Sequence, residues 1–188
     1  MDATRQTFLD ELYAHGRDVP EALRNVEPEA AELLGVLVRA LGASRVLEVG
    51  TSNGYSTIWL GDAVQAVGGR VISVEIDPER TALAQDNLTQ AGVDKCVEVR
   101  TQDAAEAFAA FGDASFDLIF LDAERREYAS YWPDIVRVLR DRGVLVVANT
   151  LSQAKELVEF SELVYAAEEM TSTLLTVGAG VLLVVKSP

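Results

Sequence analysis

Apolar positions along the chain follow two different spacings, and their succession predicts helices and strands in turn. In residues 4–15 and 28–41 the apolar side chains recur every three or four positions, which is typical of helices packed on one side. Short runs that are almost wholly apolar follow, and they indicate buried strands. The predicted strands are residues 45–49, 70–75, 95–100, 116–121, 143–148, 171–177 and 180–186.

Helical segments separate most of these strands, among them residues 104–111, 131–139 and 152–166. Strands that are apolar throughout and alternate with helices are typical of a parallel sheet covered on both faces. The last two strands face each other across a short glycine turn, which predicts an antiparallel hairpin. We therefore expect an α/β fold: a Rossmann-like, doubly wound, mostly parallel seven-stranded sheet with a C-terminal antiparallel hairpin and N-terminal helices.

Length and composition restrict the organisation and the partners. The chain has 188 residues, nearly half of them apolar, and no repeat or linker, so we expect a single domain over residues 1–188. Its 30 acidic and 16 basic side chains give a formal charge of −14. This charge repels phosphate backbones and anionic lipids, so neither nucleic acid nor a membrane is expected as a partner.

Cysteine and histidine are each present once, as Cys96 and His15. No internal disulfide, paired-cysteine zinc site or multi-histidine metal site can form from them. Residues 1–12 mix charges among few apolar residues, unlike a signal peptide or a membrane span. The expected location is the reducing cytoplasm.

A glycine-containing loop, residues 50–54, follows the first predicted strand. In a doubly wound sheet ligands bind beyond the carboxyl ends of the strands, and Glu75, which ends the next strand, can accept hydrogen bonds from a ribose. Nicotinamide, flavin and S-adenosylmethionine binders share such a loop and acid, and a plain strand-to-helix turn remains an alternative. Ser52 stands where a dinucleotide fingerprint has the glycine that admits a pyrophosphate, which disfavours a nicotinamide oxidoreductase.

Three segments in order resemble the catechol and caffeoyl-CoA O-methyltransferases, a class I family that uses S-adenosylmethionine (SAM) and has bacterial members. They are residues 48–56 (EVGTSNGYS), 74–77 (VEID) and 116–123 (FDLIFLDA). The resemblance extends from about residue 25 to residue 186. It implies a SAM-dependent transferase that methylates a small hydroxylated acceptor.

The same resemblance implies which residues contact SAM. Glu48 would approach the amino group of the methionine part, Glu75 the ribose, and Asp103 with Ala104 the adenine, while residues 25–26 would cover the cofactor. The candidate cofactor-binding residues are Asn25, Val26, Glu48, Gly50, Thr51, Ser52, Gly54, Ser56, Glu75, Ile76, Asp103, Ala104 and Asp122.

The resemblance also implies a metal site, and here the sequence departs from the family. The family holds a divalent ion, usually Mg²⁺, with an Asp after the fourth strand and an Asp-Asn pair after the fifth. This chain has Asp122 at the first position and Ala148-Asn149 at the second. Because Ala148 removes a carboxylate ligand, we expect a degenerate site in which Asp122 and Asn149 remain candidate ligands and Mg²⁺ binding is weak or lost.

The candidate catalytic residues are Asp122, Arg125 and Asn149. Arg125 occupies the position of a family lysine that assists deprotonation of the acceptor. A guanidinium stays protonated, so Arg125 can orient an anionic oxygen but cannot act as the base. Glu124, Glu127 and Tyr128 are alternative polar groups near by, and each also fits a solvated loop or helix.

The departures at Ala148 and Arg125 also support an alternative function. It is a protein that binds SAM or its product S-adenosylhomocysteine (SAH) with little or no catalysis.

The N-terminal helices, within residues 1–42, are expected to cover the cofactor. Phe8, Leu9 and Leu12 suggest a homodimer contact there, and the alternative is that this helix packs on its own domain.

Overall fold

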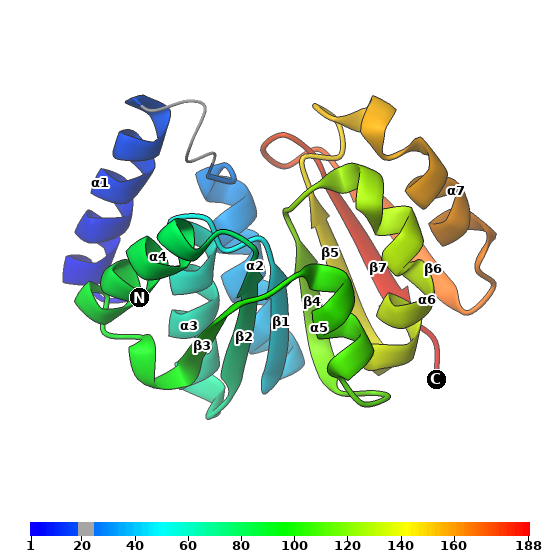
Figure 1. Ribbon diagram of the computed structural model, residues 1–188, viewed down its shortest axis with the longest axis horizontal. Helices are drawn as coiled ribbons and strands as arrows, with labels where there is room; N and C mark the ends of the chain where they lie inside the picture. The colour runs from blue at the N-terminus through cyan, green and yellow to red at the C-terminus, as the bar shows by residue number, and fades with distance from the viewer. Residues whose placement is uncertain (19–24) are drawn as a thin grey trace.

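A central sheet crosses the molecule, and its strands are the short apolar runs of the sequence (Figure 1). The computed structural model describes residues 1–18 and 25–188. In this part of the chain the sheet has seven strands in the order β3-β2-β1-β4-β5-β7-β6. All neighbours pair in parallel except β7, which is antiparallel to β5 and β6. The strands are β1 Arg45–Val49, β2 Arg70–Glu75, β3 Val97–Thr101, β4 Phe116–Leu121, β5 Leu139–Ala148, β6 Met170–Leu175 and β7 Val181–Lys186.

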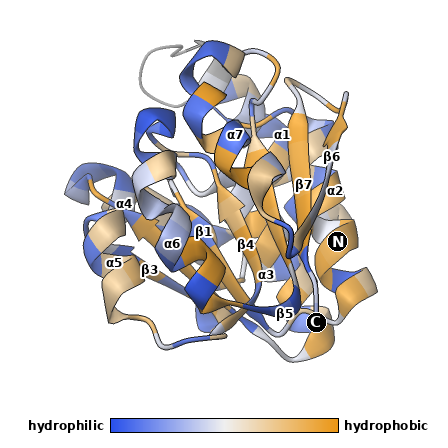
Figure 2. Ribbon diagram, turned by 90° about the vertical axis from the view of Figure 1, so that its right-hand side faces the viewer, coloured by the Kyte–Doolittle hydropathy of each residue, from blue (hydrophilic) through white to orange (hydrophobic). Residues whose placement is uncertain are grey.

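Helices cover both faces of this sheet, so the predicted doubly wound fold is confirmed. One apolar cluster joins the sheet to the first four helices, and a second joins it to the last three. Every residue of β4 is buried because both of its faces are covered. In Figure 2 the central strands are mostly hydrophobic, whereas the helices carry hydrophilic stretches. The helices are α1 Ala3–Asp18, α2 Pro28–Leu41, α3 Tyr55–Val67, α4 Pro78–Gln90, α5 Ala104–Ala110, α6 Tyr128–Val138 and α7 Val158–Ala166.

The strand order brings the carboxyl ends of β1, β2 and β4 together. After β1 the chain winds to β2 and β3 on one side, and it then crosses to β4 on the other side of β1. Val49 at the end of β1 pairs with Val74 of β2 and Leu121 of β4. The loops that follow these strands therefore meet at one edge of the sheet, where doubly wound folds bind ligands.

The predicted starts of β5 and β3 are wrong for local reasons, and β6 ends at Leu175 rather than at residue 177. The strand β5 begins at Leu139 rather than at residue 143, because Leu139 pairs with Phe116 before a register shift that accommodates the polar residues 140–142. The strand β3 begins at Val97 rather than at residue 95, because residues 94–96 form a 3-10 turn. Periodicity alone shows neither the shift nor the turn.

The predicted starts of α7 and α6 are also wrong, and α1 continues to Asp18 rather than ending at residue 15. The helix α7 begins at Val158 rather than at residue 152, because the backbone N–H groups of residues 150–152 donate to the carbonyls of Ala179 and Gly180. These contacts hold the segment as a turn against the hairpin. The helix α6 begins at Tyr128, three residues before the predicted start, after a 3-10 turn over residues 125–127.

The apolar side chains of α1 face inward. Leu9 and Leu12 are buried, and Phe8 is partly buried against the same cluster. The alternative that this helix packs on its own chain is thus confirmed, and these three residues do not form a free surface. The homodimer stays a prediction. Residues 19–24, which belong to the predicted N-terminal region, lie outside the described residues. Within the described ranges no helix is long and apolar enough to span a membrane.

Candidate functional site

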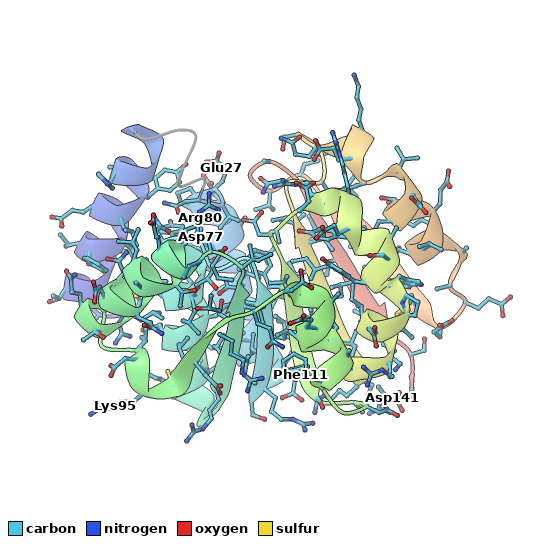
Figure 3. The ribbon with its side chains drawn as sticks, in the orientation of Figure 1. Glu27, Asp77, Arg80, Lys95, Phe111 and Asp141 are labelled. Carbon is cyan, nitrogen blue, oxygen red and sulfur yellow. The ribbon has the colours of Figure 1, made fainter. Side chains whose placement is uncertain are left out.

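A cavity of about 1050 Å³ lies at the carboxyl edge of the sheet. Figure 3 shows Glu27, Asp77 and Arg80 near this edge, at the upper end of the view, with Phe111 and Asp141 at the opposite end. Loops after β1, β2, β3, β4 and β5 all contribute to its wall. The candidate residues that line it are Asn25, Gly50, Ser52, Glu75, Ile76, Asp103, Ala104, Asp122, Arg125 and Asn149.

Gly50 lets the loop after β1 approach the end of β4 closely. Its φ is +99°, and a Cβ at this position would lie 2.4 Å from the backbone oxygen of Asp122. Backbone hydrogen bonds fix both sides, since Gly50 N–H donates to Val74 and Asp122 N–H donates to Val49, each at 2.9 Å. Only glycine fits this approach, which forms the floor of the cavity.

Glu75 is held by the loop that it faces. Its Oε2 accepts the Ser52 N–H at 2.9 Å, and its Oε1 accepts the Asp77 N–H at 3.1 Å. Each carboxylate oxygen keeps a further lone pair, so both can still accept a hydroxyl. A fixed carboxylate with two oxygens suits a ligand with two adjacent hydroxyls, such as a ribose.

Glu48 lies beneath this loop and does not line the cavity. Its Oε1 accepts the hydroxyl of Ser56 at 2.6 Å, and its Oε2 accepts those of Ser73, at 2.6 Å, and Thr57. Complete burial raises the pKa of Glu48 to about 7, although these hydrogen bonds oppose the shift. The carboxyl group thus ties β1 to β2 and α3 under the cofactor loop.

Other predicted cofactor residues also lie behind the wall rather than in it. They are Val26, Thr51, Gly54 and Ser56. Thr51 is bonded to the Ser73 hydroxyl at 2.6 Å, and Gly54 begins α3 against Ala84. All four residues are buried.

The far end of the cavity combines an apolar surface with polar groups. The side chain of Ile76 is 69% exposed although it is aliphatic. Asp103 caps α5, with its Oδ1 accepting the N–H groups of Ala105 at 2.8 Å and Glu106 at 3.3 Å. Gln102 adds an amide at the end of β3. An exposed aliphatic side chain beside polar acceptors suits a flat heterocycle such as adenine.

The opposite end of the cavity gathers Asp122, Arg125 and Asn149. Oδ1 of Asp122 accepts a hydrogen bond from Nδ2 of Asn149 at 2.8 Å and one from Nη2 of Arg125 at 3.4 Å. Burial raises the pKa of Asp122 to about 6, and the charge of Arg125 and the hydrogen bond from Asn149 limit the rise. The structure therefore brings together the three candidate catalytic residues from the ends of β4 and β5.

Comparison with known proteins agrees with this architecture. A family model described as O-methyltransferase matches residues 1–187. The chain belongs to the O-methyltransferase family. A catechol O-methyltransferase of Niastella koreensis is 35% identical over 140 residues, which are 73% of this chain and only 63% of that protein.

Two solved structures of O-methyltransferases have the same fold over the whole chain. The enzyme from Bacillus cereus, in complex with SAH, has a TM-score of 0.81 and 27% identity, with 92% of its chain covered. The O-methyltransferase TomG from Streptomyces achromogenes, in complex with SAM, has a TM-score of 0.83 and 26% identity, with 91% covered.

Within this O-methyltransferase fold the residues at the reaction end offer a metal a poor set of donors. Among the described residues Asp122 is the one carboxylate bonded to both Asn149 and Arg125, Ala148 is apolar, and the guanidinium lies 3.4 Å from the Asp122 oxygen. Mg²⁺ prefers several hard oxygens with negative charge, and a neighbouring cation opposes it. No group of three or more His, Cys, Asp or Glu side chains that could hold a metal occurs among the described residues.

The O-methyltransferase cavity also contains side chains that sequence reasoning missed. Tyr13 of α1 donates its hydroxyl to Glu27, and Tyr131 of α6 donates to Glu127. Ser152 and Gln153 come from the turn that the sequence predicted as helix. The sequence places Tyr13 and Tyr131 on helices, and no local signal shows that a helix end turns toward a cavity.

The alternative polar groups near Arg125 differ in their location: two line the cavity and one is buried. Glu124 and Glu127 line the cavity. Tyr128 is wholly buried, its hydroxyl oxygen accepts the Ala123 N–H at 2.6 Å, and burial raises its pKa far above the usual range. Tyr128 therefore supports the loop after β4 as an uncharged hydroxyl.

Proposed function

We propose that this protein is a SAM-dependent O-methyltransferase that methylates a small hydroxylated molecule. The observation that carries the proposal is that Glu75 and the Asp122, Arg125 and Asn149 group line opposite ends of one cavity. One end suits a nucleoside, and the other holds polar groups for a second small molecule. Methyl transfer requires that cofactor and acceptor share such a space.

The charges of the cavity support a cationic cofactor. SAM carries a sulfonium and an amino group against one carboxylate, so its net charge is positive. Among the described residues, the carboxylates of the lining outnumber the guanidiniums. The acids are Glu27, Glu75, Asp103, Asp122, Glu124 and Glu127, and the bases are Arg80 and Arg125.

When bound, SAM would supply an electrophilic methyl group. In this proposal Glu75 holds the ribose, Asp103 and Ala104 contact the adenine edge, and Gly50 keeps the loop close beneath the cofactor. Arg125 and Asn149 orient the acceptor oxygen. An in-line displacement requires an aligned acceptor oxygen and the exclusion of water from the reacting atoms.

We further propose that this reaction does not depend on a tightly bound metal. The support is the surroundings of Asp122: Ala148 is apolar where the family has a carboxylate, and a guanidinium lies beside the Asp122 carboxylate. We expect the affinity for SAM to be the same with added Mg²⁺ as with a chelator. A large gain in affinity or turnover with Mg²⁺ would contradict metal independence.

A second candidate function is binding of SAM or SAH without efficient catalysis. It is favoured by Arg125, because a permanently protonated group at the reaction end cannot take a proton from an acceptor. Turnover of any hydroxylated acceptor in a broad screen, detected as SAH release, would exclude this candidate. Cofactor binding with no turnover across the screen would favour it.

Calorimetric titration with SAM and SAH tests the cofactor site directly. We expect wild-type protein to bind both ligands, and Glu75→Ala to lose at least about tenfold in affinity because charge-assisted hydrogen bonds to the ribose disappear. Glu79→Ala, which removes an exposed carboxylate of α4 outside the cavity, is the matched control. Failure of wild-type protein to bind either ligand would overturn the proposed function.

A further inference from the structure

We propose that the acceptor reacts as a monoanion, with its nucleophilic oxygen held by the Arg125 guanidinium. The substrate class is then small molecules with one acidic oxygen, such as electron-poor phenols or carboxylates, rather than neutral alcohols. This inference rests on the proposed methyltransferase function.

The hydrogen-bonding state of Arg125 carries the inference. Its side chain is only 20% exposed and lines the cavity. A guanidinium has five N–H donors, yet within residues 1–18 and 25–188 it makes one long contact, from Nη2 to Asp122 at 3.4 Å. Its Nε is buried and has no hydrogen-bond partner among the described residues. A partly buried guanidinium whose buried Nε has no partner is stabilised when an anionic oxygen binds its remaining N–H groups.

The position of Arg125 places such an oxygen at the reaction end. Arg125 follows β4, and Asn149 follows the neighbouring strand β5. Both side chains donate to the same oxygen of Asp122 and both line the cavity, so they border the part of the cavity beside that carboxylate. A planar guanidinium can hold an oxyanion there with defined geometry.

The surrounding carboxylates limit the acceptor to a single negative charge. Asp122 balances Arg125, Glu124 accepts a backbone N–H from Arg126, and Glu127 accepts the Tyr131 hydroxyl. These acids lie beside Arg125 on the loop after β4 and at the start of α6. A second negative charge on the acceptor would face them without a partner, so phosphorylated acceptors are excluded.

The chemical step is then balanced without proton transfer. A lone pair of the anionic oxygen forms the new O–C bond, and the S–C bond to the methyl group breaks with its electron pair passing to sulfur. The negative charge of the acceptor and the positive charge of the sulfonium cancel. The products are a methyl ether or ester and SAH, and no base is required.

Spectroscopic titration of the SAH-loaded protein with para-nitrophenol tests the inference without turnover. The phenolate absorbs visible light and the neutral phenol does not, so absorbance reports the ionisation of the bound probe. We expect the wild-type complex to bind the phenolate and to lower the pKa of the probe. Benzoate should compete for the same site, whereas para-nitrophenyl phosphate, with the same ring and more charge, should not bind.

Two arginine variants provide the matched comparison. Arg125→Met should bind the phenolate at least about tenfold more weakly, because a charge-assisted hydrogen bond is lost. Arg126→Met removes the same charge from the next residue, which is 76% exposed and does not line the cavity, and it should bind the phenolate as wild type does. Equal weakening in both variants would overturn the inference.

SAH binding distinguishes a failure of the proposed function from a failure of the monoanion inference. If wild-type protein fails to bind SAH, the proposed function fails. If SAH binds and para-nitrophenol enters only in its neutral form, only the monoanion inference fails. Should Arg125→Met not fold, Arg125→Lys keeps the charge with fewer donors, and it should still lower the pKa of the probe at reduced affinity.

Discussion

Single residues in and beneath the loop after β1 determine the conformation of that loop. Glu48 holds β1, β2 and α3 together through hydroxyl groups, and Gly50 permits the contact between the loop and β4. Neither acts through a side chain that lines the cavity. Their contribution is to the geometry of the cavity, and it can be measured through stability and cofactor affinity.

Glu48 should make stability depend on pH. Its pKa of about 7 in the folded protein exceeds the ordinary value of 4.5, so the folded state binds the proton more tightly than the unfolded state. The stabilisation is complete below about pH 4.5 and is lost as the pH rises to about 7, a change of about 3 kcal/mol in the free energy of unfolding. Glu48→Gln should flatten this dependence in urea unfolding.

Glu79→Gln is the control for that experiment, because Glu79 is exposed on α4. It should keep the pH dependence of the wild type. The same slope in the wild type and in Glu48→Gln would show that the Glu48 proton does not stabilise the fold.

Gly50→Ala should disrupt the cavity floor. The new Cβ would combine a left-handed backbone with overlap on the Asp122 carbonyl, and we expect a loss of about 3 kcal/mol or more together with loss of SAH binding. Gly68 also has a positive φ, +69°, but a Cβ there would meet no atom within 4 Å. Gly68→Ala should therefore lower the free energy of unfolding by only about 1 kcal/mol. Equal losses in urea unfolding would show that overlap is unimportant.

At the scale of elements, the position of α1 connects stability to the site. Asp62 of α3 is 6% exposed and pairs with Arg5 of α1 and Arg39 of α2. Burial alone would raise the pKa of Asp62, but hydrogen bonds from these arginines and the N-terminus lower it. Because α1 also contributes Tyr13 and Gly16 to the cavity, this ion-pair cluster helps to position the cavity wall.

Asp62→Asn should weaken both stability and ligand binding. Two arginines would lose their carboxylate partner, and we expect a loss of about 3 kcal/mol in the free energy of unfolding. SAH affinity should fall as well because α1 loosens from α3. Asp86→Asn, at an exposed position on α4, should change neither quantity. Unchanged SAH affinity in a destabilised Asp62→Asn variant would show that the ion pairs between α1 and α3 do not affect ligand binding.

At the scale of the whole molecule, the charge of −14 surrounds a cavity that is itself acidic. Such a field attracts cations over distances comparable with the Debye length, whereas an anionic acceptor depends on the local positive charge of Arg125. SAM is cationic, whereas SAH has no net charge, so the field favours the substrate form of the cofactor over the product. An acidic surface therefore has a direct consequence for the proposed cycle.

Salt should reduce the preference for SAM over SAH. As ionic strength rises from about 0.01 M to about 1 M, screening weakens the attraction, and we expect the affinity for SAM to fall severalfold. The affinity for SAH, measured in the same calorimetric series, is the internal control and should change little. Parallel changes for both ligands would show that the field does not discriminate between them.

Much of the site was predictable because it follows directly from strand ends. Gly50, Glu75 and Asp122 each come immediately after or at the end of an apolar strand, and all of them line the cavity. Glu48 was expected in the cavity, yet it lies beneath it. A sequence pattern shows that a residue ends a strand, but the direction of its side chain depends on the twist and register of the sheet.

The sequence by itself determined the order of strands and helices, the buried character of the strands and the residues at their carboxyl ends. These properties depend on local spacing, which each segment expresses alone. Only the tertiary structure decided that Tyr13, Glu27 and the turn at residues 150–157 share a cavity with Arg125. These segments are far apart in the chain; the turn packs against the hairpin, and α1 packs against α3.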